Sequence, residues 1–390
     1  MSEAYICGAV RSAGGRRNGR LSKVHPIDLG AKVVDALVER SGVNPANVDD
    51  LIFGCVSQVG AQSSNLGRNV CISSVLGESV PGTVVDRQCG SGQQAIHFAA
   101  QAVMSGTQDI VVAGGVESMS QVPIGASIID GYKADHGTPY GEEIQQRYPG
   151  IQFSQFTGAE MLVDKYQLSK EELEEFAYAS HAKAKVAVEE DRFASEIVPI
   201  EIELEDGARE MHTQDEGIRM EATLDAIRGL EPLQEGGTIT AGMASQICDG
   251  ASAVLVANAE AVEKYGLTPM AKIVAMSVVG TDPIIMLEGP IKATEKVLER
   301  AGMSMDDIDL FEVNEAFGSV PMSWAKAMKA DLSKLNVNGG AQALGHPLGA
   351  TGAKLMTTLV HELKRQGKRY GLLAICEGGG TANGTIIEVC

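Results

Sequence analysis

The sequence has few aromatic residues and no long apolar run. Aromatic side chains make up 4% of the 390 residues, with a single Trp, whereas Gly occurs 45 times. This balance suits close packing of helices on sheets and sites that are lined by backbone. No apolar segment approaches the ~20 residues that a transmembrane helix needs, so we expect no membrane partner.

The chain also lacks recognisable targeting signals and paired-cysteine motifs. The N-terminus has no apolar segment of the signal-peptide kind, and the tail at 387–390 is not a peroxisomal tripeptide. An odd number of cysteines without C-x-x-C spacing predicts reduced thiols and disfavours a zinc site. We therefore expect a cytoplasmic protein without a metal. The seven cysteines are Cys7, Cys55, Cys71, Cys89, Cys248, Cys376 and Cys390.

Basic residues are outnumbered by acidic ones. The 32 Lys and Arg against 51 Asp and Glu give a formal net charge of −19. Such a field repels polyanions, so nucleic acid and anionic membranes are disfavoured as partners. Any anionic ligand must be bound by local basic residues or by helix N-termini.

One stretch, 84–95, has the pattern of a strand that turns directly into a helix. Two valines end an extended run, Cys89 follows at a turn, and an apolar pattern of helical period continues to Gly106, which is suited to end the helix. A thiol in this position faces unpaired backbone N–H groups at the positive end of the helix. The position is therefore expected to favour the thiolate form of Cys89.

Two other interpretations of this stretch remain open from its residues alone. A free cysteine is most often a small buried hydrophobe. The spacing Gly90-x-Gly92-x-x-Ala95 also matches part of a dinucleotide-binding fingerprint. That turn lies deep in the chain rather than in an opening βαβ unit, which disfavours a nucleotide site. Cys89 needs chemical partners elsewhere in the chain before it indicates catalysis.

The chain is too long for one ordinary core and divides into segments of different character. Residues 1–118 alternate extended and helical patterns, whereas 119–245 carry an acidic helix over 170–190 and an alternating strand over 197–204, which is typical of an inserted loop domain. We predict an N-terminal half made of 1–118 and 246–270, a loop domain of 119–245, and a C-terminal half of 271–390.

The C-terminal half repeats the N-terminal one. The repeat predicts two similar halves with mostly parallel sheets covered by helices, related by a pseudo-twofold axis. Residues that follow equivalent strands would then converge on one site. Segments 37–43, 48–49 and 90–92 match 297–303, 308–309 and 350–352 at one fixed offset, and the strand 109–115 matches 370–376 one residue out of step.

Three polar groups would meet Cys89 under this symmetry. His346 lies in the glycine-rich turn that mirrors the Cys89 turn, where an imidazole can take a proton from a thiol. Asn314 follows one strand of the second half and can donate to an oxyanion or hold a water. Cys376 follows another strand, before three glycines whose N–H groups can bind an oxyanion. Taken singly, these residue types are more often a structural histidine, a satisfied loop asparagine and an inert buried cysteine.

The four motifs together resemble one known family, the thiolases. They occur in the family's order and spacing, and the resemblance covers essentially the whole chain. It implies an α/β thiolase fold, with two duplicated βαβαβαββ halves in a layered αβαβα core and an inserted loop domain. The motifs are Cys89-Gly90-Ser91-Gly92, Asn314-Glu315-Ala316-Phe317, Gly345-His346-Pro347 and Cys376-Glu377-Gly378-Gly379-Gly380.

The resemblance implies an acyltransferase that acts on CoA thioesters. Cys89 would be the nucleophile that carries the acyl group, and His346 would activate it. His346 and a water on Asn314 would form one oxyanion hole, and the N–H groups of Cys89 and Gly378 a second. Cys376 would move protons at the Cα of acetyl-CoA.

The resemblance also implies the ligands and partners. Coenzyme A, acyl-CoA and acetyl-CoA would be substrates, with no permanently bound cofactor and no metal. Ser245 is similar to a serine that contacts the pantetheine arm, and Arg219 to an arginine near the adenine nucleotide. The family further implies a homodimeric core, assembled into a homotetramer through the loop domains.

Some residues depart from the pattern of short-chain biosynthetic thiolases. The loop domain has 154–158 where that group has His-Met, Gln93-Gln94 follow the Cys89 motif, and Glu377 stands where an apolar residue is usual. These differences favour a degradative enzyme for a longer or bulkier acyl chain. Two alternatives stay open, a non-catalytic lipid-binding relative and a ketosynthase-like enzyme, although the latter lacks a second catalytic cysteine.

Overall fold

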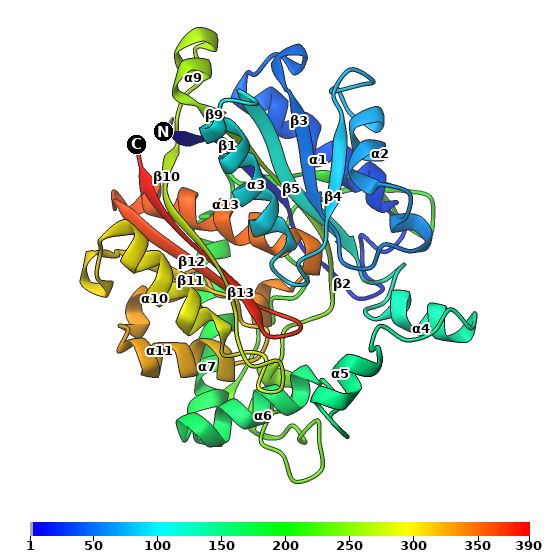
Figure 1. Cartoon of the computed structure of the whole chain (residues 1–390), viewed down its shortest axis with the longest axis vertical. Helices are drawn as coiled ribbons and strands as arrows, with labels where there is room; N and C mark the ends of the chain where they lie inside the picture. The colour runs from blue at the N-terminus through cyan, green and yellow to red at the C-terminus, as the bar shows by residue number, and fades with distance from the viewer. Residues whose placement is uncertain (1–2) are drawn as a thin grey trace.

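The computed structural model describes residues 3–390 and is built around one 11-stranded mixed sheet. Its main path runs β11-β12-β13-β10-β1-β9-β5-β3-β4, with β2 beside β9 and β6 beside β1. Each half of the chain contributes one side of this path (Figure 1). The strands are β1 (Ala4–Ser12), β2 (Gly15–Arg16), β3 (Asp50–Gly54), β4 (Gly82–Val85), β5 (Ile110–Ser118), β6 (Ile197–Val198), β9 (Cys248–Asn258), β10 (Ala271–Gly280), β11 (Leu310–Val313), β12 (Tyr370–Glu377) and β13 (Thr381–Val389).

The helices of the two halves lie on both faces of this sheet. Several of them begin or end at the expected signals. α1 has Pro26 in its first turn, and a left-handed Gly directly follows α1, α3, α10 and α13. The helices of the halves are α1 (Pro26–Ser41), α2 (Leu66–Ser73), α3 (Ser91–Ser105), α9 (Ala259–Tyr265), α10 (Gly289–Ala301), α11 (Ser319–Met328), α12 (Ala341–Leu344) and α13 (Leu348–Gln366).

The expectation of mostly parallel sheets is wrong. Strands β3, β4 and β5 pair in parallel, as do β11 and β12, but β9 and β13 run antiparallel to both of their neighbours. The final strand of each half re-enters the sheet between its first strand and its parallel set, and therefore reverses direction. β1 and β10 join the halves through only two residue pairs.

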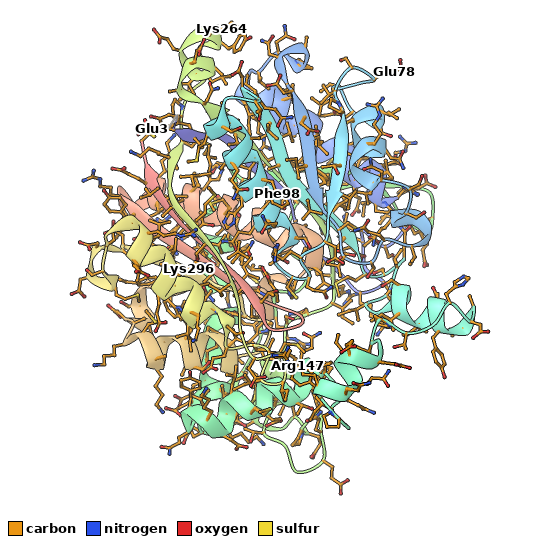
Figure 2. The ribbon with its side chains drawn as sticks, viewed as in Figure 1. Glu3, Glu78, Phe98, Arg147, Lys264 and Lys296 are labelled. Carbon is orange, nitrogen blue, oxygen red and sulfur yellow. The ribbon has the colours of Figure 1, made fainter. Side chains whose placement is uncertain are left out.

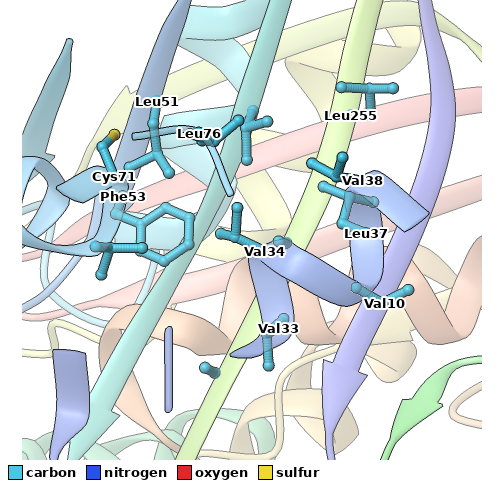
Figure 3. Packing of buried hydrophobic residues seen from close by; sticks show 14 of the residues in the cluster. Val10, Val33, Val34, Leu37, Val38, Leu51, Phe53, Cys71, Leu76 and Leu255 are labelled. Atoms are coloured by element: carbon cyan, nitrogen blue, oxygen red, sulfur yellow. The ribbon is translucent and has the colours of Figure 1, made fainter. Parts of the chain in front are cut away.

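The arrangement of the cores confirms a five-layer αβαβα molecule. One apolar cluster lies between the N-terminal sheet and α1 and α2, and Figure 3 shows Val34 and Leu37 of α1 pointing toward Phe53 and Leu255 of that sheet. A second cluster surrounds α3 and α13, which pack together between the two halves. A third lies between the C-terminal sheet and α10 and α11.

The two central helices meet at a pair of equivalent glycines. A Cβ on Gly92 would lie 2.8 Å from the carbonyl oxygen of Gly349, and one on Gly352 would lie 2.0 Å from the backbone nitrogen of Gln93. Only glycine permits this approach. Gly92 and Gly352 are one repeat apart and lie against each other's helix, as expected of residues on a pseudo-twofold axis.

The repeat is more regular than the sequence comparison indicated. Asp49 accepts hydrogen bonds from the backbone at Asp109 and Ile110, and Asp309 accepts them from Arg369 and Tyr370. β5 therefore begins at Ile110 and β12 at its equivalent, Tyr370. The prediction that this strand pair is one residue out of step is wrong, because its apolar composition hid the register.

The segment between β5 and β9 forms the lower part of the molecule in Figure 1, with α4 and α5 projecting to one side. The predicted strand over 197–204 is divided at Pro199, which has no N–H to donate. Its first part is β6 in the main sheet, and its second pairs with β8 in a two-stranded sheet. The elements are α4 (Ala126–Lys133), α5 (Glu142–Arg147), α6 (Gln155–Tyr166), α7 (Lys170–Glu189), β7 (Ile200–Glu203), β8 (Arg209–His212) and α8 (Leu224–Arg228).

No helix within residues 3–390 combines the length and the apolar character needed to cross a bilayer.

Candidate active site

Cys89 lies where β4 is followed by α3, as predicted. Gln88 adopts a left-handed backbone conformation with φ of 48° and turns the chain sharply before the cysteine. Ser91 holds this turn, because its hydroxyl accepts from the Arg87 backbone N–H at 2.8 Å and donates to the Gln88 carbonyl at 2.6 Å. The Cys89 side chain is 8% exposed. The thiol is thus fixed just outside the first turn of α3 and almost out of water.

The expectation that this position favours the thiolate is wrong for the resting protein. Burial, reinforced by the nearby Glu377 carboxyl, raises the pKa of Cys89 to about 12. The backbone N–H groups of Cys89 and Gly378 lower its pKa, but by less than burial raises it. Ionisation of Cys89 at neutral pH therefore needs a base within the site.

His346 is oriented to act as that base. Its Nδ1 lies 2.6 Å from the Thr351 hydroxyl, and that hydroxyl donates its hydrogen to the Pro347 carbonyl at 2.9 Å. Since Thr351 has one hydrogen to give, Nδ1 must carry a proton and donate to it. The lone pair of the neutral ring is then on Nε2, which lies 3.3 Å from the side-chain nitrogen of Asn314.

The electrostatics of His346 keep it neutral. Burial, together with the positive charge of Lys354, lowers its pKa to about 3. Lys354 also donates to the carbonyl oxygens of Leu344 and Gly345, so that it holds the end of α12 in front of the histidine. Thr351 and Lys354 were not predicted as site residues from the sequence. Both lie in the first two turns of α13, and only the fold shows that they face back toward His346.

A buried charge network surrounds Lys354. Its Nζ lies 3.7 Å from the carboxylate of Asp215, which also pairs with Arg11 at 2.9 Å. Arg11 is fully buried and pairs in addition with Glu196 at 2.6 Å. Asp215 and Glu196 belong to the segment between β5 and β9. The network therefore connects that segment to the helix that supports His346.

The second cysteine and its glycines lie next to Cys89. Cys376 is 1% exposed, and burial raises its pKa well above the ordinary value, with a further rise from the nearby Cys89 sulfur. Gly378 lies against Gln88, since a Cβ on Gly378 would be 2.9 Å from the Gln88 side-chain oxygen. The end of β12 and the Cys89 turn are thus brought together from opposite halves of the chain.

Asn314 completes the set of converging residues. It follows β11, and its backbone N–H donates to the Ala374 carbonyl of β12 at 3.1 Å. Its side-chain oxygen is buried and has no hydrogen-bond partner among residues 3–390. That oxygen can accept a hydrogen bond from a water or a substrate. The structure therefore places Asn314 with His346, and places Cys376 and Gly378 with Cys89.

Ser245 and Arg219 lie at the periphery of this cluster. Ser245 is half-buried and its backbone N–H donates to the Ala316 carbonyl at 2.9 Å, so it borders the Asn314 motif. Arg219 is exposed, and its backbone N–H donates to Nδ1 of His181 at 3.2 Å. Gln246 connects both regions to His346, because it donates to the Gly217 carbonyl and accepts from the His346 backbone N–H.

Comparison with known proteins identifies the same architecture over the full chain. Residues 4–260 match the family model for the thiolase N-terminal domain, and 267–389 match that for the thiolase C-terminal domain. A steroid 3-ketoacyl-CoA thiolase of Mycobacterium tuberculosis is 51% identical, over 100% of this chain and 94% of that protein. A 3-ketoacyl-CoA thiolase of Bacillus subtilis is 39% identical, over 100% of both chains. The crystal structure of Bacillus anthracis acetyl-CoA acetyltransferase superposes with a TM-score of 0.89 at 35% identity, covering 100% of this chain and 99% of that one.

Proposed function

Because the chain belongs to the thiolase family, we propose that it transfers an acyl group from a 3-oxoacyl-CoA to CoA through a thioester on Cys89, with release of acetyl-CoA. The same site would run the reverse Claisen condensation. Two observations support this most directly: the buried thiols of Cys89 and Cys376 lie together from opposite halves of the chain, and the neutral His346 contacts Asn314.

The first half-reaction starts with proton transfer from Cys89 to Nε2 of His346. The thiolate attacks the 3-oxo carbon, the bond between C2 and C3 breaks, and Cys376 protonates the departing Cα of acetyl-CoA. In the second half-reaction the Cys376 thiolate takes the proton of CoA, whose sulfur attacks the Cys89 thioester. His346 then returns its proton to Cys89. Each proton has a donor and an acceptor inside the site, which suits a buried pair of thiols.

Two groups of donors would stabilise the negative oxygens. The protonated Nε2 of His346, with a water held by the free side-chain oxygen of Asn314, would serve the thioester oxygen of the CoA substrate. The N–H groups of Cys89 and Gly378 point toward the Cys89 sulfur and would serve the oxygen of the covalent intermediate. Removing one such donor typically costs ~10²–10³ in kcat.

CoA would be bound from the periphery inward. We assign Ser245, which borders the Asn314 motif, to the pantetheine arm. The exposed Arg219 would meet the anionic nucleotide, which the net charge of −19 otherwise repels. CoA is a substrate in this assignment, with no permanently bound cofactor. The reaction belongs in the cytoplasm, where Cys89 and Cys376 remain reduced.

The preferred acyl chain is proposed to be long or bulky. The relative at 51% identity is a thiolase named for steroid substrates. In this chain, Phe156 is 44% exposed and packs edge-on against Phe317, with ring centroids 5.5 Å apart, next to the Asn314 motif. A thiolysis series from acetoacetyl-CoA to polycyclic 3-oxoacyl-CoAs tests this proposal. A kcat/KM that is highest for acetoacetyl-CoA would contradict it.

The central experiment concerns the acyl-enzyme. Incubation with a 3-oxoacyl-CoA should add one acyl mass to the peptide that contains Cys89, and Cys89→Ala should abolish both this adduct and turnover. Cys390→Ala is the matched control, since Cys390 is exposed at the C-terminus and should be dispensable. Turnover that persists in Cys89→Ala would refute the mechanism and revive the alternative of a non-catalytic acyl-CoA-binding protein.

A homodimeric core and a homotetramer are proposed for the assembly. β4 is an edge strand of the main sheet, and Phe98 on the neighbouring α3 is 40% exposed. Figure 2 labels Phe98 on this part of the molecule. Edge strands and exposed aromatics are typical of surfaces that pair. The exposed apolar side chains of α4 form a second surface, which would suit contact between two dimers.

A further inference from the structure

Glu377 is a buried carboxyl in direct contact with the Cys89 turn. Its side chain is fully buried and immediately follows Cys376 at the end of β12. A Cβ added to Gly90 would lie 1.8 Å from Oε1 of Glu377, so the carboxyl occupies the space that a side chain next to Cys89 would need. Glu377 therefore packs directly on the backbone of the Cys89 turn at Gly90.

Two residues of β13 hold the carboxyl in place. The Thr381 hydroxyl donates to Oε2 at 2.6 Å. In the orientation that satisfies both of its ends, the Asn383 amide donates from its nitrogen to Oε1 at 3.0 Å and accepts from the Gln94 backbone N–H at 3.3 Å. Each carboxyl oxygen of Glu377 thus has one side-chain donor from β13 that holds it in place.

The equivalent residue of the other half shows what Glu377 lacks. Glu117 stands one repeat earlier, and its carboxylate accepts from the backbone N–H groups of Val56, Ser57 and Gly349. Within residues 3–390, no backbone N–H donates to Glu377 and no cation lies within ion-pair distance of it. The charged group near it is Arg87, whose positive charge favours the carboxylate. The two neutral thiols of Cys89 and Cys376 are also close, and a carboxylate at Glu377 opposes their ionisation.

We propose that Glu377 is a positioning residue for the two thiols: as a neutral acid, it joins β13 to the Cys89 turn and keeps negative charge away from Cys89 and Cys376. Burial raises the pKa of Glu377 to about 8. Below that pH Glu377 is neutral, and the pKa of each thiol is lower than it would be beside a carboxylate. Above it, the carboxylate raises the pKa of both cysteines, so formation of the Cys89 thiolate is opposed. The inference rests on the proposed role of Cys89 as nucleophile.

The test compares the full-length enzyme with Glu377→Gln, which keeps the shape and the oxygen that Thr381 contacts. The rate at which iodoacetamide alkylates Cys89, followed by peptide mass, is measured from pH 6.5 to 9.5, with kcat/KM for a 3-oxoacyl-CoA alongside. Each rate of the variant is divided by the wild-type rate at the same pH, which removes any pH dependence that comes from the reagent or the substrate. This ratio should be near one at pH 6.5 and rise roughly threefold to tenfold by pH 9, since one pKa unit corresponds to a factor of ten.

A flat ratio across this range would overturn the inference, and so would a Gln variant that reacts more slowly at every pH. Thr381→Val is a second variant, for use if Glu377→Gln does not fold. This variant lacks a hydrogen bond that favours the carboxylate, so the pKa of Glu377 should rise. The pH at which ionised Glu377 begins to slow the alkylation of Cys89 should therefore be higher in Thr381→Val than in wild type. If that pH is unchanged, the inference is equally overturned. A flat ratio in an enzyme that still forms the Cys89 acyl adduct refutes only Glu377, whereas absence of that adduct refutes the proposed mechanism.

Discussion

At the scale of single residues, Thr351 decides which nitrogen of His346 is available. Replacing Thr351 with Val removes the acceptor of the Nδ1 proton and leaves a buried donor unsatisfied, which costs ~1–3 kcal/mol. The imidazole then loses its preference for the productive tautomer, and kcat/KM should fall about tenfold to a hundredfold. Thr351→Ser keeps the hydroxyl and should remain within a few-fold of wild type. Steady-state kinetics with an unfolding control checks this, and equal activity of Val and Ser variants would contradict it.

The positions of the catalytic candidates could be predicted, but their ionisation could not. Cys89, His346, Asn314 and Cys376 stand in motifs whose order and spacing are visible in the chain. The sequence shows that Cys89 precedes a helix, which lowers its pKa, but not that the thiol is almost completely buried, which raises it more. Thr351 and Lys354 escaped notice because their contacts depend on how α13 folds back on His346.

At the scale of elements, the contact between α3 and α13 sets the geometry of the site. Gly352→Ala would place a Cβ 2.0 Å from the backbone nitrogen of Gln93, and neither helix can yield without moving the Cys89 or His346 turn. We expect a loss of about 3 kcal/mol in unfolding free energy, the upper range for overpacking. We also expect a lower kcat, because the Cys89 or His346 turn would be displaced. The measurement is chemical unfolding at fixed protein concentration.

Gly131→Ala is the control for that substitution. Gly131 lies within α4, has no atom within 4 Å of an added Cβ and does not require a positive φ. Alanine should be neutral or stabilise the protein by ~0.4–1 kcal/mol. If Gly352→Ala is as stable as Gly131→Ala, the close approach of the two helices is not what holds the halves together.

The sequence predicted individual elements better than their pairing. Helix ends at Gly42 and Gly106 and the buried strand after Asp109 follow from local signals. The insertion of β9 and β13 as antiparallel strands depends on contacts between residues more than a hundred positions apart in the first half. Local apolar periodicity contains no information about that direction.

At the scale of the whole molecule, two sets of buried groups give opposite pH dependences. Burial lowers the pKa of His97 and His346 to about 3 and of His181 to about 4, so the unfolded chain binds more protons below pH 6.5 and stability falls as the pH falls. Burial raises the pKa of Glu312 well above its ordinary value and that of Glu377 to about 8, so each acid favours the folded state as the pH falls from its raised pKa toward 4.5.

A variant isolates the contribution of the histidines from that of the acids. His97→Gln keeps a polar partner for Thr385, which lies 2.7 Å from Nε2, but cannot titrate. Whatever its stability at pH 7.5, the variant should gain about 2 kcal/mol relative to wild type between pH 7.5 and pH 5, because 1.36 kcal/mol is lost per pH unit below 6.5. Urea unfolding at the two pH values measures the difference. If the difference in unfolding free energy between variant and wild type is the same at both pH values, His97 is protonated in the folded protein at pH 5.

The proposed assembly into a tetramer would depend on α4, which projects from the body in Figure 1. Ala126 is the only residue of α4 that is buried, whereas Ile128 and Ile129 are 50% and 51% exposed and Tyr132 is 74% exposed. Because a chain of net charge −19 repels its copies, association must come from such apolar surface. Replacing Ile128 and Ile129 with Asp should convert a tetramer to an active dimer, as measured by light scattering. Leu332→Asp, at an exposed site outside α4, is the control and should leave the mass of the assembly unchanged. A wild-type monomer, or a double variant that remains tetrameric, would refute this role of α4.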